Sequence, residues 1–291
     1  MKRFSKITAC LLAVIMLFCS CSDFSFVGLT DSRIDLESIP EFQNTPYIEI
    51  NGNIPDFDES ELKAKSFESY GELDALGRCT TCVSCIGVDL MPTEKRGPIG
   101  DVKPTGWHSD KYANVDGNYL YNRCHLIGYQ LTAENANRKN LITGTRYLNV
   151  QGMLPFEDEV ADYIKDTGNH VLYEVTPVFK DSELLARGVH MQAQSIEDGG
   201  KGVSFNVYCY NAQPGIEIDY QTGDNKAGKT EYIFDDKNSK STYIVNTNSK
   251  KFHKPACTAV EDMNPANKKE YKGTRSSLIN NGYSPCKICN P

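Results

Sequence analysis

Apolar side chains recur at helical spacing in the middle of this chain. They are Met153, Phe156, Val160, Tyr163 and Ile164. This period of three and four residues predicts an amphipathic helix. Pro155 fits its first turn, where no backbone N–H is needed, and Thr167-Gly168-Asn169 is a stop signal.

Alternating and β-branched runs follow this helix and predict antiparallel strands. The expected strands are His170–Phe179, Leu184–Ile196, Val203–Tyr210 and a last one near Ile216–Tyr220. Turn residues at 180–182 and 198–200 separate the first three. Earlier in the chain, Tyr47–Ile50 alternates and predicts a first strand. Glu59–Ser66 has weak helical spacing.

A further strand is expected to lead from Tyr119 into the run Tyr121-Asn122-Arg123-Cys124-His125 and to end at His125. We expect Thr143-Gly144-Thr145 to be a turn. Asn149 precedes the predicted helix and Glu157 falls in its second turn. Both side chains can therefore face one site.

The N-terminus has the pattern of a secretory signal in residues 1–20. Basic residues precede a short apolar run from Ile7 to Phe18, too short to span a membrane. Cys21 follows a small residue and resembles the lipidated cysteine of a bacterial lipoprotein; the alternative is simple secretion. Residues 21–45 are polar and are expected to form a tether. The sequence thus predicts an extracellular protein, released or anchored at the cell surface.

Charge is distributed unevenly along the chain. The 291 residues include 31 Lys and Arg and 38 Asp and Glu. Residues 237–291 hold ten basic and three acidic residues, a net charge of +7, whereas residues 21–236 carry −17. An acidic body does not attract polyanions from a distance, but a basic tail can. The asymmetry favours a substrate-binding tail, although a merely solvated tail would look the same.

The run ending at His125 carries the candidate chemistry. Its imidazole can take a proton from water near neutral pH, and Arg123 can pair with charge that develops on phosphorus. Downstream amide and carboxylate oxygens can hold a hydrated Mg²⁺ ion; they belong to Asn140, Asn149 and Glu157. This set of groups is suited to hydrolysis of a phosphodiester bond.

These residues resemble the DNA/RNA non-specific endonucleases of the ββα-metal class. The family carries Asp-Arg-Gly-His where this chain has Asn122-Arg123-Cys124-His125. It also carries Asn-x-Gly with an acid eight positions after the Asn, here Asn149-Val150-Gln151-Gly152 and then Glu157. The resemblance spans roughly residues 67–224. Asn122 in place of an acid weakens any charge-based orientation of Arg123, and Cys124 replaces a small residue.

The resemblance implies an α+β fold, with a central antiparallel sheet and a ββα-metal element, over residues 46–224. It implies that His125 is the general base, that Asn149 binds Mg²⁺ directly, and that Arg123 contacts the phosphate or supports the site. Glu157 and Asn140 would hold metal-bound waters or orient the loop. The expected substrates are DNA and RNA, cut with little sequence specificity to leave 5′-phosphate ends.

A second motif lies in the C-terminal region. His253 and Cys257 form one pair, and Cys286 and Cys289 form another about thirty residues later. This spacing suits a closed tetrahedral Zn²⁺ site and resembles the metal-binding module of the Ada DNA-repair protein. We expect a zinc-binding module at residues 243–291 after a linker at 225–242. Disulfides are the alternative in an oxidising compartment.

The remaining candidates carry less information. Cys79, Cys82 and Cys85, with Cys124 as a fourth ligand, could form another metal site, but a local disulfide or reduced thiols are more common. Cys209 and Trp107 are expected to be packing residues, and no partner pattern accompanies His108, His170 or His190.

Two alternative functions remain open. One uses the same residues, and the other uses none of them. A nucleotide pyrophosphatase or small phosphodiesterase would need the same side chains in a narrower pocket. A non-catalytic binding protein would depend on the zinc module and the basic tail alone. The oligomeric state and the preference between DNA and RNA are not predicted.

Overall fold

The computed structural model describes residues 34–228 and 241–291, apart from 256, 262, 274–276, 279–280, 287–288 and 290. The predicted signal, the lipidation candidate Cys21, the first part of the tether and most of the linker lie outside these residues. No helix within the described ranges is long and apolar enough to cross a membrane.

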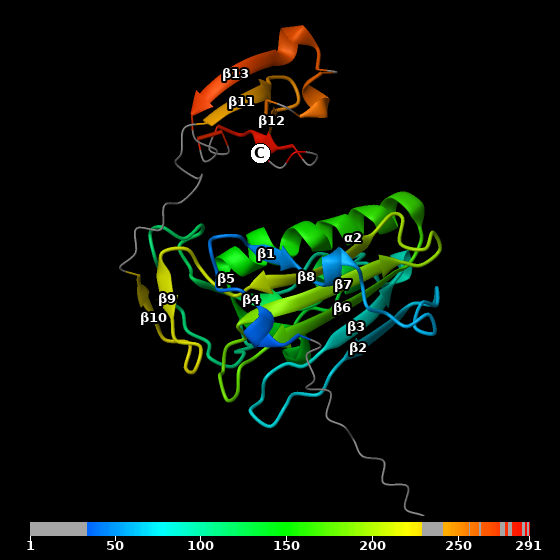
Figure 1. Cartoon of the computed structure of the whole chain (residues 1–291), viewed down its shortest axis with the longest axis vertical. Helices are drawn as coiled ribbons and strands as arrows, with labels where there is room; N and C mark the ends of the chain where they lie inside the picture. The colour runs from blue at the N-terminus through cyan, green and yellow to red at the C-terminus, as the bar shows by residue number, and fades with distance from the viewer. Residues whose placement is uncertain are drawn as a thin grey trace, which may run out of the picture.

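A six-stranded antiparallel sheet forms the centre of the larger part (Figure 1). Its order is β1-β8-β7-β6-β3-β2. The bounds are Tyr47–Glu49 (β1), Phe67–Tyr70 (β2), Cys82–Ile86 (β3), Val171–Val178 (β6), Gly188–Ser195 (β7) and Ser204–Tyr210 (β8). The expected strands of the second half and the strand at Tyr47 are confirmed. The order shows a meander, β6-β7-β8, to which earlier strands add on both sides.

Helix α2, Leu154–Thr167, packs across one face of this sheet (Figure 1). Phe156, Val160 and Ile164 are buried against alternate residues of the meander, among them Tyr173 and Phe205. Gly168 ends the helix in the left-handed conformation (φ 74°), which costs glycine least. The predicted helix and its stop signal are therefore confirmed.

A second, two-stranded sheet brings His125 beside α2. Strand β4, Tyr121–His125, pairs antiparallel with β5, Leu141–Thr145, so that His125 lies opposite Leu141. The expected turn at 143–145 is wrong, because these residues complete β5. A π-helical turn, Leu148–Met153, then joins β5 to α2. The short helix α1, Tyr129–Thr132, follows β4. Strand, strand and helix make the ββα element, and the fold is α+β.

Several other expectations are corrected. Glu59–Ser66 forms a turn and extended chain with no helix, because its weak apolar period finds no surface to cover. Strand β10, Asn225–Ala227, pairs with β9, Ile216–Ile218, inside the expected linker. Apolar residues of the expected tether, beginning at Ile34, pack with Tyr208 and Tyr210. The packed chain therefore begins before residue 46.

The C-terminal residues form a separate four-stranded sheet of order β13-β11-β12-β14. The strands are Ser241–Asn246 (β11), Lys251–His253 (β12), Lys268–Gly273 (β13) and Ser284–Pro285 (β14). Two small apolar clusters flank it. One surrounds Tyr243 and Phe252, and the other contains Cys257 and Cys286.

Candidate active site

A cleft of about 770 Å³ opens beside the ββα element. Its lining combines one histidine, amides, a carboxylate, arginines and aromatic rings. Apart from tyrosines, the polar members are Arg96, Ser109, Asn122, Arg123, His125, Gln130, Arg146, Asn149 and Glu157. The sequence motif at 122–125 thus meets Asn149 and Glu157 in one cleft.

His125 lies at the end of β4 with only 7% of its surface exposed. Its Nε2 is 2.7 Å from the backbone carbonyl oxygen of Asn135. A carbonyl only accepts, so Nε2 carries the proton and Nδ1 keeps its lone pair. Burial, aided by the positive charge of Arg96, lowers the pKa of His125 to about 4. The imidazole is therefore neutral at pH 7.

Glu157 lies in the first turn of α2, where its carboxyl group packs against Gly128. A Cβ atom at residue 128 would come within 2.8 Å of the Glu157 carboxylate oxygen, so any larger residue there would displace it. Although Glu157 is partly exposed, burial of its carboxyl group raises its pKa to about 8. Asp158 adds to the rise and Arg96 opposes it. A nearby cation would favour the ionised form.

Asn149 lies in the π-helical turn, whose wider hydrogen-bond spacing is common at functional sites. Gly152 in the same turn packs closely on β8, since a Cβ atom there would be 3.3 Å from Cys209. The turn is therefore anchored to the sheet.

The side chain of Arg123 binds the loop that precedes the motif. Its guanidinium stacks on the ring of Trp107 at 4.0 Å, and its Nη2 donates to the carbonyl oxygen of Gly100 at 2.8 Å. Its Nε donates to the carbonyl oxygen of Val102. Trp107, expected only to pack, packs on this arginine at the cleft wall. The side chain of Asn122 bonds to Arg146 and Asn149 rather than to Arg123.

Two arginines of the cleft were not predicted from the sequence. Arg146 follows β5 and binds Asp116. Arg96 is exposed on the loop before Ile99 and forms no ion pair or hydrogen bond within the described residues. Its charge acts on both His125 and Glu157. The adjacent pair Lys95-Arg96 was the only available sequence signal, and it carries no motif.

Asn140 is fully buried and does not line the cleft. Its Oδ1 accepts from the backbone N–H of Ile127 at 2.8 Å, and its Nδ2 donates to the carbonyl oxygen of Ile127 at 2.9 Å. Both ends of the amide are therefore occupied by the chain that follows His125. This geometry fits loop orientation and leaves Asn140 no free oxygen directed at a cleft-bound ion.

The other cysteines of this part are core residues with free thiols. Cys79 and Cys82 donate to backbone carbonyls of residues 138–141, Cys85 donates to Lys63, and Cys124 is fully buried. Among the described residues, these cysteines form no cluster able to hold a metal. The suggested second metal site is therefore not supported.

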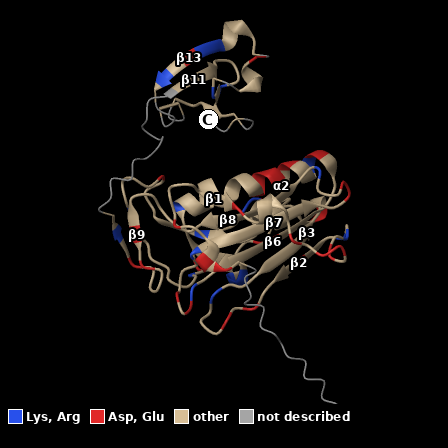
Figure 2. Ribbon diagram, viewed as in Figure 1, with Lys and Arg blue, Asp and Glu red and all other residues tan. Residues whose placement is uncertain are grey.

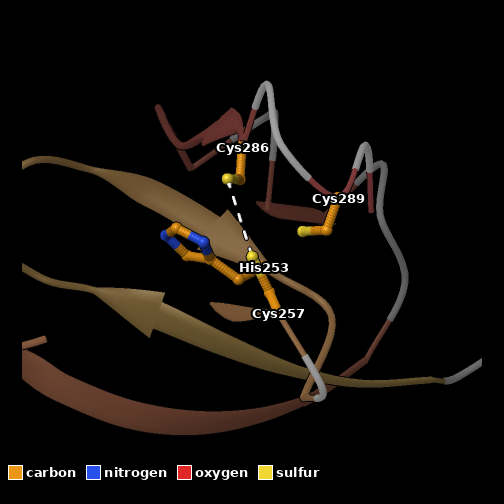
Figure 3. A group of neighbouring side chains, drawn as sticks. All are labelled: His253, Cys257, Cys286 and Cys289. Atoms are coloured by element: carbon orange, nitrogen blue, oxygen red, sulfur yellow. Dashed lines mark hydrogen bonds between the residues drawn. The ribbon is translucent and has the colours of Figure 1, made fainter. Parts of the chain in front are cut away.

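The four candidate metal ligands of the C-terminal region do lie close together. Figure 3 shows His253, Cys257, Cys286 and Cys289 close together, the first on β12, the second in the chain after β12 and the last two after β14. Their ligand atoms all lie within 4.8 Å of one another, and the sulfur atoms of Cys257 and Cys286 are 4.0 Å apart. The Nδ1 atom of His253 is buried and has no hydrogen-bond partner in the part of the chain that the structure describes. These four residues form a group that could hold a metal ion.

Part of the chain matches a known protein family. Residues 60–197 match the family described as DNA/RNA non-specific endonuclease. A deoxyribonuclease of Streptococcus dysgalactiae subsp. equisimilis is 34% identical over 110 residues, which are 36% of this chain and 32% of that protein. The match therefore spans about a third of the relative.

Solved structures agree on the fold. NucA from Streptococcus agalactiae with a bound magnesium ion has a TM-score of 0.55 at 24% identity, over 63% of this chain and 87% of that one. The Sda1 nuclease with bound zinc ion has a TM-score of 0.52 at 26% identity, over 63% and 97%. Residues 60–197 therefore resemble the DNA/RNA non-specific endonuclease family, whose model they match. The resemblance of the C-terminal residues to the Ada module stays a prediction.

Proposed function

We propose that the protein is an extracellular, metal-dependent endonuclease that hydrolyses phosphodiester bonds of DNA and RNA with little sequence specificity. The observation that carries the proposal is that His125, Asn149 and Glu157 line the same cleft. Its imidazole is neutral and is oriented by the carbonyl group of Asn135. The match of residues 60–197 to the DNA/RNA non-specific endonuclease family supports the same activity.

His125 is the general base in this proposal. With its proton on Nε2, it offers Nδ1 to a water molecule in the cleft, and a low pKa keeps that atom unprotonated at neutral pH. The guanidinium of Arg96, which has no partner among the described residues, is available to bind the phosphate beside His125. Arg123 and Asn140 act as positioning residues, since their polar atoms bind loop backbone.

The cleft also fits Mg²⁺, as implied by the family. Asn149 offers an amide oxygen, and Glu157 is a carboxyl group whose ionised form is penalised by burial, which a cation would relieve. Asn149 would bind the ion directly and Glu157 would bind its waters. When bound, Mg²⁺ would neutralise charge on the leaving 3′ oxygen.

Location and domain limits complete the proposal. A signal at residues 1–20, and a lipid anchor at Cys21 or simple release, would place the enzyme outside a bacterial cell. The nuclease domain is assigned to residues 46–224, and the packing of residues 34–42 against it extends the folded unit back to Ile34.

Magnesium dependence tests this function. Asn149→Ala should cut activity severely and move half-maximal activity to higher Mg²⁺ concentration, while Glu157→Gln should do less. Plasmid cleavage at graded Mg²⁺ concentrations, with EDTA as control, measures both effects. Cleavage that EDTA leaves unchanged contradicts the proposal, as does wild-type behaviour of both variants.

We also propose that the cluster of His253, Cys257, Cys286 and Cys289 binds one structural Zn²⁺. Four N and S ligands within 4.8 Å suit a closed tetrahedral site. The Nδ1 of His253, which forms no hydrogen bond with the described residues, supplies a lone pair. The backbone N–H of Lys254 donates to the sulfur of Cys289 at 3.3 Å, an outer-shell contact that stabilises a thiolate. Two small apolar clusters alone give this module little core.

Elemental analysis tests the zinc site. The intact chain should contain about one zinc per molecule, and Cys286→Ser should lose it. Cys209→Ser, a buried cysteine of the sheet, is the matched control and should keep the zinc. Disulfides among the four residues with no zinc, found by mass spectrometry, would contradict the site.

A further inference from the structure

One oxygen atom in the cleft accepts two hydrogen bonds. Oδ1 of Asn122 is 3.3 Å from Nη1 of Arg146 and 3.4 Å from Nδ2 of Asn149. Asn122 lies on β4, Arg146 directly follows β5, and Asn149 lies in the π-helical turn. The oxygen therefore links three of the segments that line the cleft.

The chemistry of these groups fixes which way each amide points. A guanidinium only donates, so Asn122 must present its oxygen to Arg146. The same oxygen only accepts, so Asn149 must present its nitrogen to Asn122. The oxygen of Asn149 leaves the same carbon in another direction and accepts no hydrogen bond from the described residues. It is the atom able to bind a cation.

Asp116 orients Arg146. The hydrogen bonds from Asp116 through Arg146 and Asn122 to Asn149 form a relay. Oδ2 of Asp116 accepts from Nε and Nη2 of Arg146 at 3.1 and 3.0 Å. With these two atoms occupied, Nη1 is the donor that reaches Asn122. Each link in the relay from Asp116 to Asn149 thus has one permitted polarity.

We infer that Asn122 is a positioning residue that sets the metal affinity of the site by orienting the amide of Asn149. The inference rests on the proposed function, in which Asn149 binds Mg²⁺. Without the oxygen of Asn122, the Asn149 amide can rotate and present its nitrogen to the cleft. An acid at position 122 would keep the accepting oxygen and add a negative charge. Outer-shell partners of this kind typically change metal affinity by about 10–100-fold.

Calorimetric titration with Mg²⁺, which does not depend on turnover, is the direct test. Asn122→Ala should weaken Mg²⁺ binding by about 10–100-fold, and half-maximal activity should need correspondingly more Mg²⁺. Asn122→Asp should bind Mg²⁺ at least as tightly as the wild type. Asn169→Ala, which removes an amide outside the cleft lining, is the matched control and should leave binding unchanged.

Two results would overturn the inference: wild-type Mg²⁺ affinity in Asn122→Ala, or equal loss in Asn122→Ala and Asn122→Asp. If Asn122→Ala does not fold, Arg146→Met removes the donor that fixes the relay and should weaken Mg²⁺ binding. Normal binding in that variant then overturns the inference. A wild type that neither binds Mg²⁺ nor cleaves removes both the proposed function and the inference. A wild type that does both leaves the function standing, whatever Asn122→Ala shows.

Discussion

Nε2 of His125 lies 2.7 Å from the backbone carbonyl oxygen of Asn135. Asn135 comes after α1, in the loop that returns the chain toward β5. The contact selects one tautomer of a buried imidazole and leaves Nδ1 as its basic atom. The backbone carbonyl group of Asn135 thus fixes the tautomer in which His125 can act as the proposed general base.

Arg96 should be needed for catalysis although no motif contains it. Arg96→Ala removes the one cleft arginine that has no partner among the described residues, and it should lower the cleavage rate by about 10²–10³-fold. Lys95→Ala is the control, because Lys95 is exposed and does not line the cleft. Equal, small effects of both substitutions in a plasmid assay would reduce Arg96 to a surface charge.

The lowered pKa of His125 should appear in the pH dependence of stability. The folded-state pKa of about 4 lies below the ordinary value of 6.5, so the unfolded chain binds the proton first. Below pH 6.5 the wild type should therefore lose stability relative to His125→Gln, up to about 3 kcal/mol by pH 4.

Urea unfolding of both proteins in EDTA measures this difference. The comparison also removes the opposing effect of Glu157, whose raised pKa makes stability fall as pH rises from 4.5 toward 8 in both proteins. A difference that does not change between pH 6.5 and 4 would show that burial does not shift His125.

The basic C-terminal module should strengthen binding of long substrates without taking part in the chemistry. Figure 2 shows basic residues gathered on the edge strand β13, where Lys268, Lys269 and Lys272 are exposed. Truncation before Tyr243 should raise KM for long DNA and flatten its salt dependence, with kcat little changed.

Charge alone can be tested in the intact module. Lys269→Gln with Lys272→Gln should reproduce part of the effect, while a short oligonucleotide should be cut almost normally. Lysine is also common on edge strands, where it prevents aggregation. If truncation left KM and the salt dependence unchanged, protection of the edge strand would remain as the role of these lysines.

An element could be predicted from the local sequence where its hydrophobic pattern agrees with its long-range packing. The period of α2 and the alternation of β6, β7 and β8 appear in the structure as predicted. Strand β3 was not predicted, because its place depends on pairing with β6, almost ninety residues later in the chain. Strand β2 was not predicted either, and it joins the sheet only through β3. The helix expected at Glu59–Ser66 failed for the converse reason, since it had no surface to cover.

The residues of the candidate site also fall into those that the sequence predicts and those that it does not. Arg123, His125, Asn149 and Glu157 could be found because the motif fixes their residue types and spacing. Arg96 and the carbonyl group of Asn135 could not, since each reaches the site through a loop whose path no local pattern encodes. The two hydrogen bonds between the Asn140 amide and the backbone of Ile127 could not be predicted from the sequence either.

The most direct test of the central claim compares the wild type with His125→Ala on supercoiled plasmid in Mg²⁺. His170→Ala, which removes a histidine paired with Glu197 outside the cleft lining, serves as the matched control. The wild type and the control should nick the plasmid, and EDTA should stop both. His125→Ala should fold normally and cleave at least about 10²–10⁴-fold more slowly. Cleavage by His125→Ala at the wild-type rate would contradict the assignment of His125 as the general base.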